Sequence, residues 1–168
     1  MRSTDVADDN LHRGIFHMRL KHAPDDFFVL SPLDPENDNV LSRYMTGQKR
    51  SSWWFCNKCG VRCFTTRHET EQAEVELPSK SLEQLGFTEH PEPSEDGLVK
   101  MPVWKIKNEG FAESPHGTSY FSLNAVTLDA HQGLNLAAWH ENKWVQYVDS
   151  LGDGKGWKTG EPHPGGIY

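Results

Sequence analysis

Cysteine is scarce in this sequence, and long apolar runs and basic segments are absent from it. The 168 residues include three cysteines, all between positions 56 and 63, which is too few for the disulfide framework of a small secreted protein. No stretch approaches the run of about 18 apolar residues that a membrane-spanning helix needs. The net charge of −7 argues against a nucleic-acid partner, because binding to a phosphate backbone depends on basic side chains.

The start of the sequence also lacks an apolar segment. Asp5, Asp8 and Asp9 make residues 1–11 acidic, so we expect a disordered N-terminal segment and no secretory signal. Free clustered cysteines suit a reducing compartment. The sequence therefore predicts a soluble, intracellular protein, cytoplasmic by default, whose partners include neither a membrane nor a nucleic acid.

Glycine, proline and aromatic residues are plentiful by contrast. Fourteen glycines and ten prolines divide the chain into short segments, which favours many short strands over long helices. Six tryptophans and eight phenylalanines, in a chain that is 36% hydrophobic, indicate a core built largely from aromatic rings. We therefore expect a mainly β fold of antiparallel strands with one or two short helices.

The pattern along the chain predicts a single domain over residues 12–150. An acidic surface insertion is expected at 78–100, and an irregular tail rich in glycine and proline at 151–168. The segment 134–139 is the best candidate for a helix. Short runs of alternating or β-branched residues predict the strands, at 15–20, 27–30, 40–45, 52–55, 61–65, 73–77, 101–106, 119–123 and 143–148.

The chain is organised around a C-x-x-C sequence, Cys56 and Cys59, followed at once by Gly60. Two thiolates at this spacing converge on one metal ion, and a glycine lets the backbone turn tightly beneath them. The pattern is typical of zinc, for which these two cysteines would supply half of a four-ligand structural site. The alternative is a relic turn with free thiols.

Ligands for the other half of such a site are not evident. Cys63 lies on the predicted strand after the turn, where a small buried apolar side chain is the commoner role. The alternation places Cys63 and Thr65 on one face of that strand, with Arg62 and Phe64 on the other. Histidines are the other candidates, since any of them could supply an imidazole: His12, His17, His22 and His68.

Other residues admit two interpretations. Trp53 and Trp54, just before the C-x-x-C, could stack on a ligand, but paired aromatic residues in a strand are more often core. Familiar catalytic patterns are missing from the sequence. It contains no Ser–His–Asp order with a supporting motif, no glycine loop for phosphate and no H-E-x-x-H. The catalytic residues of any activity thus stay unknown from sequence.

Two stretches carry a resemblance to a known family. One is Phe55 to Gly60, with its C-x-x-C-G, and the other is the segment 122–129, with Asn124 and Asp129. Together, over residues 12–150, they resemble the family of glutathione-dependent formaldehyde-activating enzymes (GFA) and centromere protein V domains. The resemblance implies a cysteine-rich β-tent fold and carbon–sulfur lyase activity on glutathione–aldehyde adducts such as S-hydroxymethylglutathione.

The same resemblance implies two zinc positions. One is structural and joins an upstream C-x-C to the cysteines that match Cys56 and Cys59. The other is catalytic and is held by a cysteine cluster that also lies upstream. Residues 1–55 of this sequence contain no cysteine, so the resemblance implies an N-terminally truncated or degenerate member.

We therefore expect a zinc-binding protein whose nominal activity is that of a carbon–sulfur lyase, impaired by the absence of these upstream ligands. The alternative is a non-catalytic β-domain that serves as a binding or scaffold module with at most a structural zinc. A zinc-ribbon nucleic-acid binder would fit the C-x-x-C but not the acidic charge.

Overall fold

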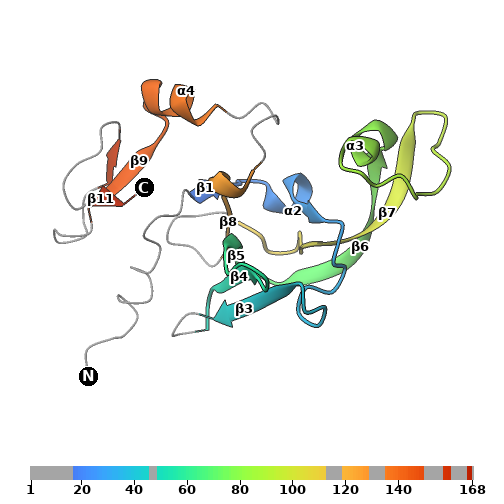
Figure 1. The fold of residues 1–168 in the computed structure, drawn as a ribbon, viewed down its shortest axis with the longest axis horizontal. Coiled ribbons are helices and arrows are strands. Elements are labelled where there is room, and N and C mark those ends of the chain that lie inside the picture. The colour runs from blue at the N-terminus through green and yellow to red at the C-terminus, as the bar shows by residue number, and fades with distance from the viewer. Residues whose placement is uncertain are drawn as a thin grey trace.

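The computed structural model describes residues 17–45, 49–112, 119–128, 135–149, 157–159 and 166–167. Antiparallel strands dominate these residues and helices are short, as Figure 1 shows. The mainly β class predicted from the sequence is confirmed, with three short α-helices where one or two were expected. No helix in the described part of the chain is long and apolar enough to cross a membrane.

The largest unit is a five-stranded sheet in the order β1-β8-β5-β4-β3, with antiparallel pairing throughout. The hairpin formed by β4 and β5 carries the C-x-x-C at its tip. Each strand lies within or beside a predicted one: β1 (His17–Arg19), β3 (Leu41–Met45), β4 (Ser52–Cys56), β5 (Arg62–Arg67) and β8 (Tyr120–Asn124).

A three-stranded antiparallel sheet packs beside it, in the order β2-β7-β6. Its strands are β2 (Phe28–Val29), β6 (Thr70–Pro78) and β7 (Leu98–Ile106). Strict alternation in β6 leaves Glu74 and Glu76 exposed on one face, whereas Ala73 and Val75 on the opposite face are half-buried. This period of two is the strand signal that the sequence predicts at 73–77.

A small third sheet has the order β10-β9-β11. It contains β9 (Gln146–Asp149), β10 (Trp157–Thr159) and β11 (Gly166–Ile167). The sequence predicts an irregular tail over 151–168, whereas two short strands of that tail pair with β9. Strands of two or three residues are too short to show an alternating pattern, so backbone pairing alone reveals them.

Four short helical segments connect the strands. Pro24 occupies the first turn of α2, where its missing N–H group leaves no hydrogen bond unmade. The side chain of Asn135 caps α4 by accepting a hydrogen bond from the Ala138 N–H at 2.9 Å. The segments are α2 (Ala23–Asp26), α3 (Ser79–Gln84), the 3-10 turn η2 (Ala125–Thr127) and α4 (Leu136–Glu141).

The acidic segment 78–100 contains helix α3 and the beginning of β7. Leu82 of α3 is 1% exposed, so this segment has an apolar anchor of its own. Its carboxylates are mostly exposed, namely those of Glu83, Glu92, Glu95 and Asp96, with Glu89 also at the surface. Leu82 therefore anchors helix α3 against β6, while the carboxylates of the segment face outward.

The core lies between the five-stranded and three-stranded sheets and is mostly aromatic, as the composition predicts. Trp54 stacks on Phe64 with ring centroids 5.7 Å apart and meets Trp104 edge-on at 5.5 Å. Each such pair adds about 1 kcal/mol beyond the burial of its area. The cluster comprises Ala23, Trp54, Phe64, Trp104, Ile106 and Phe121.

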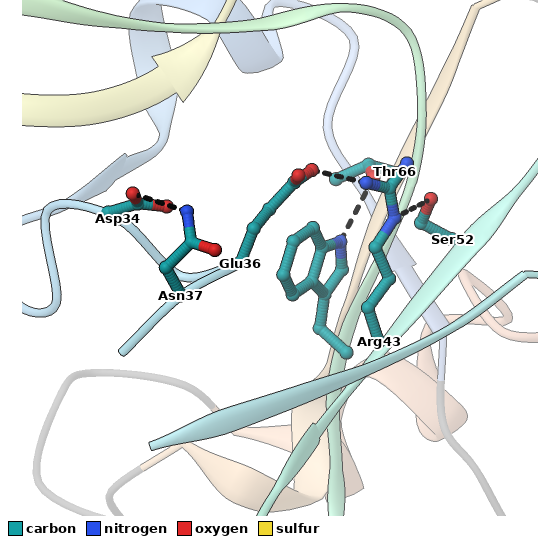
Figure 2. Close-up of polar contacts among 7 residues, drawn as sticks. Asp34, Glu36, Asn37, Arg43, Ser52 and Thr66 are labelled. Atoms are coloured by element: carbon teal, nitrogen blue, oxygen red, sulfur yellow. Dashed lines mark hydrogen bonds and ion pairs between the residues drawn. The ribbon is translucent and has the colours of Figure 1, made fainter. Parts of the chain in front are cut away.

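Polar contacts complete the environment of Trp54. Its Nε1–H donates to the Thr66 hydroxyl at 3.1 Å, so the buried indole has a hydrogen-bond partner. The guanidinium of Arg43 lies 5.4 Å from the centroid of the indole ring. Arg43 also donates to the Ser52 hydroxyl at 2.8 Å and forms an ion pair with Glu36 (Figure 2). Trp54 is therefore a core residue, in line with the commoner of its two interpretations.

A β-bulge changes the facing of the strand that follows the C-x-x-C. The pairing of β4 and β5 shifts between Trp54 and Phe55, so that Arg62 pairs with Phe55. The Arg62 guanidinium lies 4.6 Å from the ring centroid of Trp53, on the side of the sheet away from the core. Phe64 packs inside the core. The prediction that Arg62 and Phe64 share a face is therefore wrong.

Candidate metal centre

The C-x-x-C closes a tight turn at the tip of the β4–β5 hairpin. The Gly60 N–H donates to the Cys56 carbonyl at 2.8 Å, and the Cys56 N–H donates to the Val61 carbonyl at 2.9 Å. Gly60 has a φ of 72°, a left-handed conformation that glycine adopts without the strain of a Cβ atom. The residue types of the turn therefore fix its shape, and the tight turn that the sequence predicts at Gly60 is confirmed. We call residues 56–60 the knuckle.

The Cys56 thiol has a lowered pKa. The backbone N–H of Cys59 contributes most to lowering the pKa of Cys56, followed by the backbone N–H of Lys58 and the Cys59 thiol. These groups stabilise the thiolate form of Cys56, which is the form that binds metal. The Cys59 side chain is exposed and that of Cys56 is half-buried. Both predicted ligands thus lie together at an accessible tip.

Cys63 has a different environment. It packs against the aromatic core, and its thiol donates a weak hydrogen bond to the Val61 carbonyl at 3.6 Å. Burial, and then the nearby Cys56, raise the pKa of the Cys63 thiol, opposite to the shift of Cys56. This environment matches the small apolar role that the sequence favours for Cys63.

Two of the candidate histidine ligands, His17 and His68, form hydrogen bonds with other residues. His17 contacts Ser122 and Arg62, and His68 contacts Ser119 and the Glu109 carbonyl. His22 is exposed, and His12 lies outside the described residues. Within the described part of the chain, no three His, Cys, Asp or Glu side chains are grouped so that they could hold a metal. The knuckle there brings together two thiols, half the number of ligands that a structural zinc takes.

A buried polar cluster that the sequence did not predict lies on the second face of the five-stranded sheet. We define this face as the side away from the core, which carries His17, Trp53 and Ser122. Arg62 reaches across it and donates to His17 Nε2 at 2.9 Å. A guanidinium only donates, so Nε2 is the acceptor and Nδ1 carries the proton. His17 Nδ1 then donates to the Ser122 hydroxyl at 2.8 Å, and the Tyr120 hydroxyl lies 3.3 Å from the same nitrogen.

This cluster has perturbed ionisation. Burial, followed by the charges of Arg62 and Arg19, lowers the pKa of His17 to about 4. Burial also lowers the pKa of Arg62 to about 10, although the neighbouring Tyr120 opposes the shift. His17 is consequently neutral near pH 7, and both of its ring nitrogens are engaged. It cannot act as a base toward Ser122, because its proton already faces that hydroxyl.

The remaining candidates have structural positions. Trp53 is buried beneath Arg62, rather than available to stack on a ligand. Asn124 is buried, and its amide donates to the Arg62 carbonyl at 2.9 Å, whereas Asp129 lies outside the described residues.

A second Ser–His pair, Ser119 and His68, has the proton arrangement of a nucleophile and base. Ser119 is 0% exposed, so no substrate can reach its hydroxyl.

Nothing in the sequence marked the cluster on the second face. His17 and Ser122 are 105 residues apart, and only the pairing of β1 with β8 brings them together. Comparison of the chain with models of known protein families, with curated proteins and with solved structures finds no match.

Proposed function

We propose that this protein is a zinc-binding β-domain in which Cys56 and Cys59 anchor the ion. The observation that carries the proposal is the closed turn, in which the Gly60 N–H donates to the Cys56 carbonyl and both Cys56 and Cys59 lie at an accessible hairpin tip. The backbone N–H groups of Cys59 and Lys58 lower the pKa of Cys56 in this turn. Peptide N–H groups stabilise a thiolate before the metal arrives and keep its orientation once the ion is bound. A thiolate pair of this kind suits zinc better than harder cations such as magnesium or calcium.

The role we propose for the zinc is structural. Two ligands come from the knuckle, and the other two come from outside the described residues or from another molecule. Bound metal would join the hairpin tip to whatever supplies those ligands and would add its binding free energy to folding. Under this proposal the domain is a binding or scaffold module, and its exposed acidic segment is the surface for partners.

The GFA and centromere protein V resemblance adds a nominal activity, that of a carbon–sulfur lyase on a glutathione–aldehyde adduct such as S-hydroxymethylglutathione. Such chemistry needs a zinc with an exchangeable position that polarises the adduct or ionises a thiol. A zinc bound at the knuckle offers no such position once its coordination is completed by protein ligands. We therefore propose that lyase activity is impaired in this chain.

Metal analysis tests the proposal directly. The 168-residue chain is expressed, dialysed against a chelator, reloaded with zinc and freed of excess ion by gel filtration. Retention of close to one zinc per chain, with an increase in melting temperature, is the expected result. Retention of no zinc at micromolar protein would contradict the proposal and leave the knuckle as a turn with free thiols.

A further inference from the structure

The two knuckle cysteines lie in one closed turn and differ in accessibility. They are three positions apart, and the Cys56 N–H donates to the Val61 carbonyl at 2.9 Å, so the turn brings both side chains to the tip of the hairpin. Cys59 is exposed, whereas Cys56 is half-buried. The two residues between them form the turn, and the backbone hydrogen bond from Gly60 to Cys56 holds its ends together. Two adjacent thiols in a closed turn are the geometry of a redox-active dithiol.

We propose that Cys56 and Cys59 are a modification site that forms an intramolecular disulfide by exchange with a low-molecular-weight disulfide. Cys59 receives the incoming sulfur because it is the exposed thiol. Cys56 then resolves the mixed disulfide because the closed turn holds it near Cys59. Cys63 takes no part, since it packs against the aromatic core and bonds to the Val61 carbonyl instead.

The exchange is balanced in two steps. In the first, the Cys59 sulfur attacks one sulfur of the small disulfide, whose S–S bond breaks, and the leaving thiolate takes up the thiol proton of Cys59. In the second, the Cys56 sulfur attacks Cys59 in the mixed disulfide and releases the second small thiol, which takes up the proton of Cys56. The protein loses two electrons, and the small disulfide gains them as two thiols.

The surroundings of the knuckle favour this exchange. Lys58 lies between the two cysteines and is exposed, so it can attract a small disulfide that carries carboxylates. No atom outside residues 59–61 lies within 4 Å of the place that a Cβ atom would take at Gly60, so the turn has open space beside it. Exposed disulfides in tight turns are generally the easily reduced ones, and the modification is therefore reversible.

The inference extends the proposed function in one respect only. Where zinc is bound, its thiolate ligands are shielded, and oxidation of the dithiol would release the ion. That consequence rests on the proposed zinc binding, whereas formation of the disulfide does not. A chain that binds no zinc would still form it, so failure of the one proposal is distinguishable from failure of the other.

The test treats the chelator-stripped 168-residue chain with glutathione disulfide, and in parallel with the uncharged hydroxyethyl disulfide. Peptide mapping of the wild-type chain is expected to show loss of two hydrogen atoms in the peptide that carries Cys56 and Cys59, and recovery with dithiothreitol. Cys56→Ser should accumulate one mixed disulfide on Cys59, while Cys59→Ser should react about tenfold more slowly.

Cys63→Ala is the matched control, since it removes a third cysteine from the same segment and should leave the product unchanged. Its fold, and that of the serine variants, is checked by circular dichroism. A wild-type chain with all three thiols still free after treatment would overturn the proposal, as would a disulfide that involves Cys63. Accumulation of the mixed disulfide on Cys56 in Cys59→Ser, as fast as on Cys59 in Cys56→Ser, would overturn the assigned order.

Discussion

The guanidinium of Arg62 donates a hydrogen bond to Nε2 of His17 at 2.9 Å, across the second face of the five-stranded sheet. This contact requires a neutral imidazole, because a protonated ring has no acceptor nitrogen. It also places a cation next to any charge that His17 would acquire. The cluster therefore couples the protonation of one buried side chain to the stability of the sheet.

The free energy of unfolding should consequently fall as the pH is lowered through the range between the two pKa values of His17, in the unfolded chain and in the fold. The pKa of His17 falls from 6.5 in the unfolded chain to about 4 in the fold, so the unfolded chain binds the proton first. The stabilisation is complete above pH 6.5 and is lost as the pH falls toward 4, by on the order of 3 kcal/mol. Urea unfolding at several pH values measures it.

Carboxylates titrate in the same range, so the comparison must be between variants. His17→Gln keeps an acceptor for Arg62 but cannot be protonated, and it should flatten the pH dependence between 4 and 6.5. His22→Gln, a change at an exposed histidine, is the matched control and should leave it as in the wild type. Identical profiles for His17→Gln and wild type would contradict the prediction.

The aromatic core should dominate the free energy of unfolding. Trp54→Ala removes a fully buried indole that packs against two aromatic rings and donates to Thr66, and it should cost about 3–5 kcal/mol. Trp144→Ala is the control, since Trp144 is 68% exposed and its loss should change stability by less than about 0.5 kcal/mol. Equal losses from the two variants, measured by urea unfolding, would refute this account of the core.

Substitution of the three cysteines should affect the retention of zinc differently. Cys56→Ser and Cys59→Ser should each abolish retention of zinc and the stability gained from it, because both sulfurs lie in the knuckle. Cys63→Ser should retain the wild-type amount, since that thiol packs against the core. Metal analysis after gel filtration measures all three. Equal loss of zinc from the three variants would show that Cys63 is a ligand.

Two glycine variants distinguish an effect of the knuckle's shape on zinc binding from a general effect of backbone strain on stability. Gly60 and Gly86 both have a positive φ, 72° and 82°, and at neither does an atom beyond the two adjoining residues lie within 4 Å of the place that a Cβ atom would take. Each change to alanine should therefore cost about 1 kcal/mol in unfolding free energy. Only Gly60→Ala should also weaken zinc binding, because it distorts the turn that presents the two ligands. Weaker zinc binding by Gly86→Ala would argue against a local cause.

Features that depend on neighbouring residues were predictable from the sequence, and features that depend on strand pairing were not. The knuckle follows from Cys56, Cys59 and Gly60 within five positions. The strand β6 was predictable from the alternation of apolar and charged side chains at residues 73–77. The facing of Arg62 could not be predicted, because the bulge that reverses it belongs to the pairing with β4.

The cluster around His17 illustrates the same limit at longer range. His17 lies 45 residues from Arg62 and 105 from Ser122 in the sequence. Each of these residues has an ordinary polar role when considered alone. Only the order β1-β8-β5 places them on one face, and burial there gives His17 and Arg62 their lowered pKa values.

Lyase activity gives the last prediction. Cleavage of a glutathione–formaldehyde adduct needs a zinc with an exchangeable position beside a pocket that accepts the adduct. The knuckle supplies two thiolates, the Cys63 thiol packs against the core, and His17 and His68 are engaged by other side chains. An open zinc site would need three other ligands in place of the absent upstream cysteines, all with the correct geometry. The zinc-loaded 168-residue chain should therefore neither form nor cleave S-hydroxymethylglutathione faster than the uncatalysed reaction, as followed by formaldehyde consumption in the presence of glutathione. Cys56→Ser is the matched control, because any activity that depends on the knuckle must disappear with it. Robust turnover by the wild-type chain that Cys56→Ser abolishes would overturn the prediction and make the knuckle part of an open, catalytic zinc site.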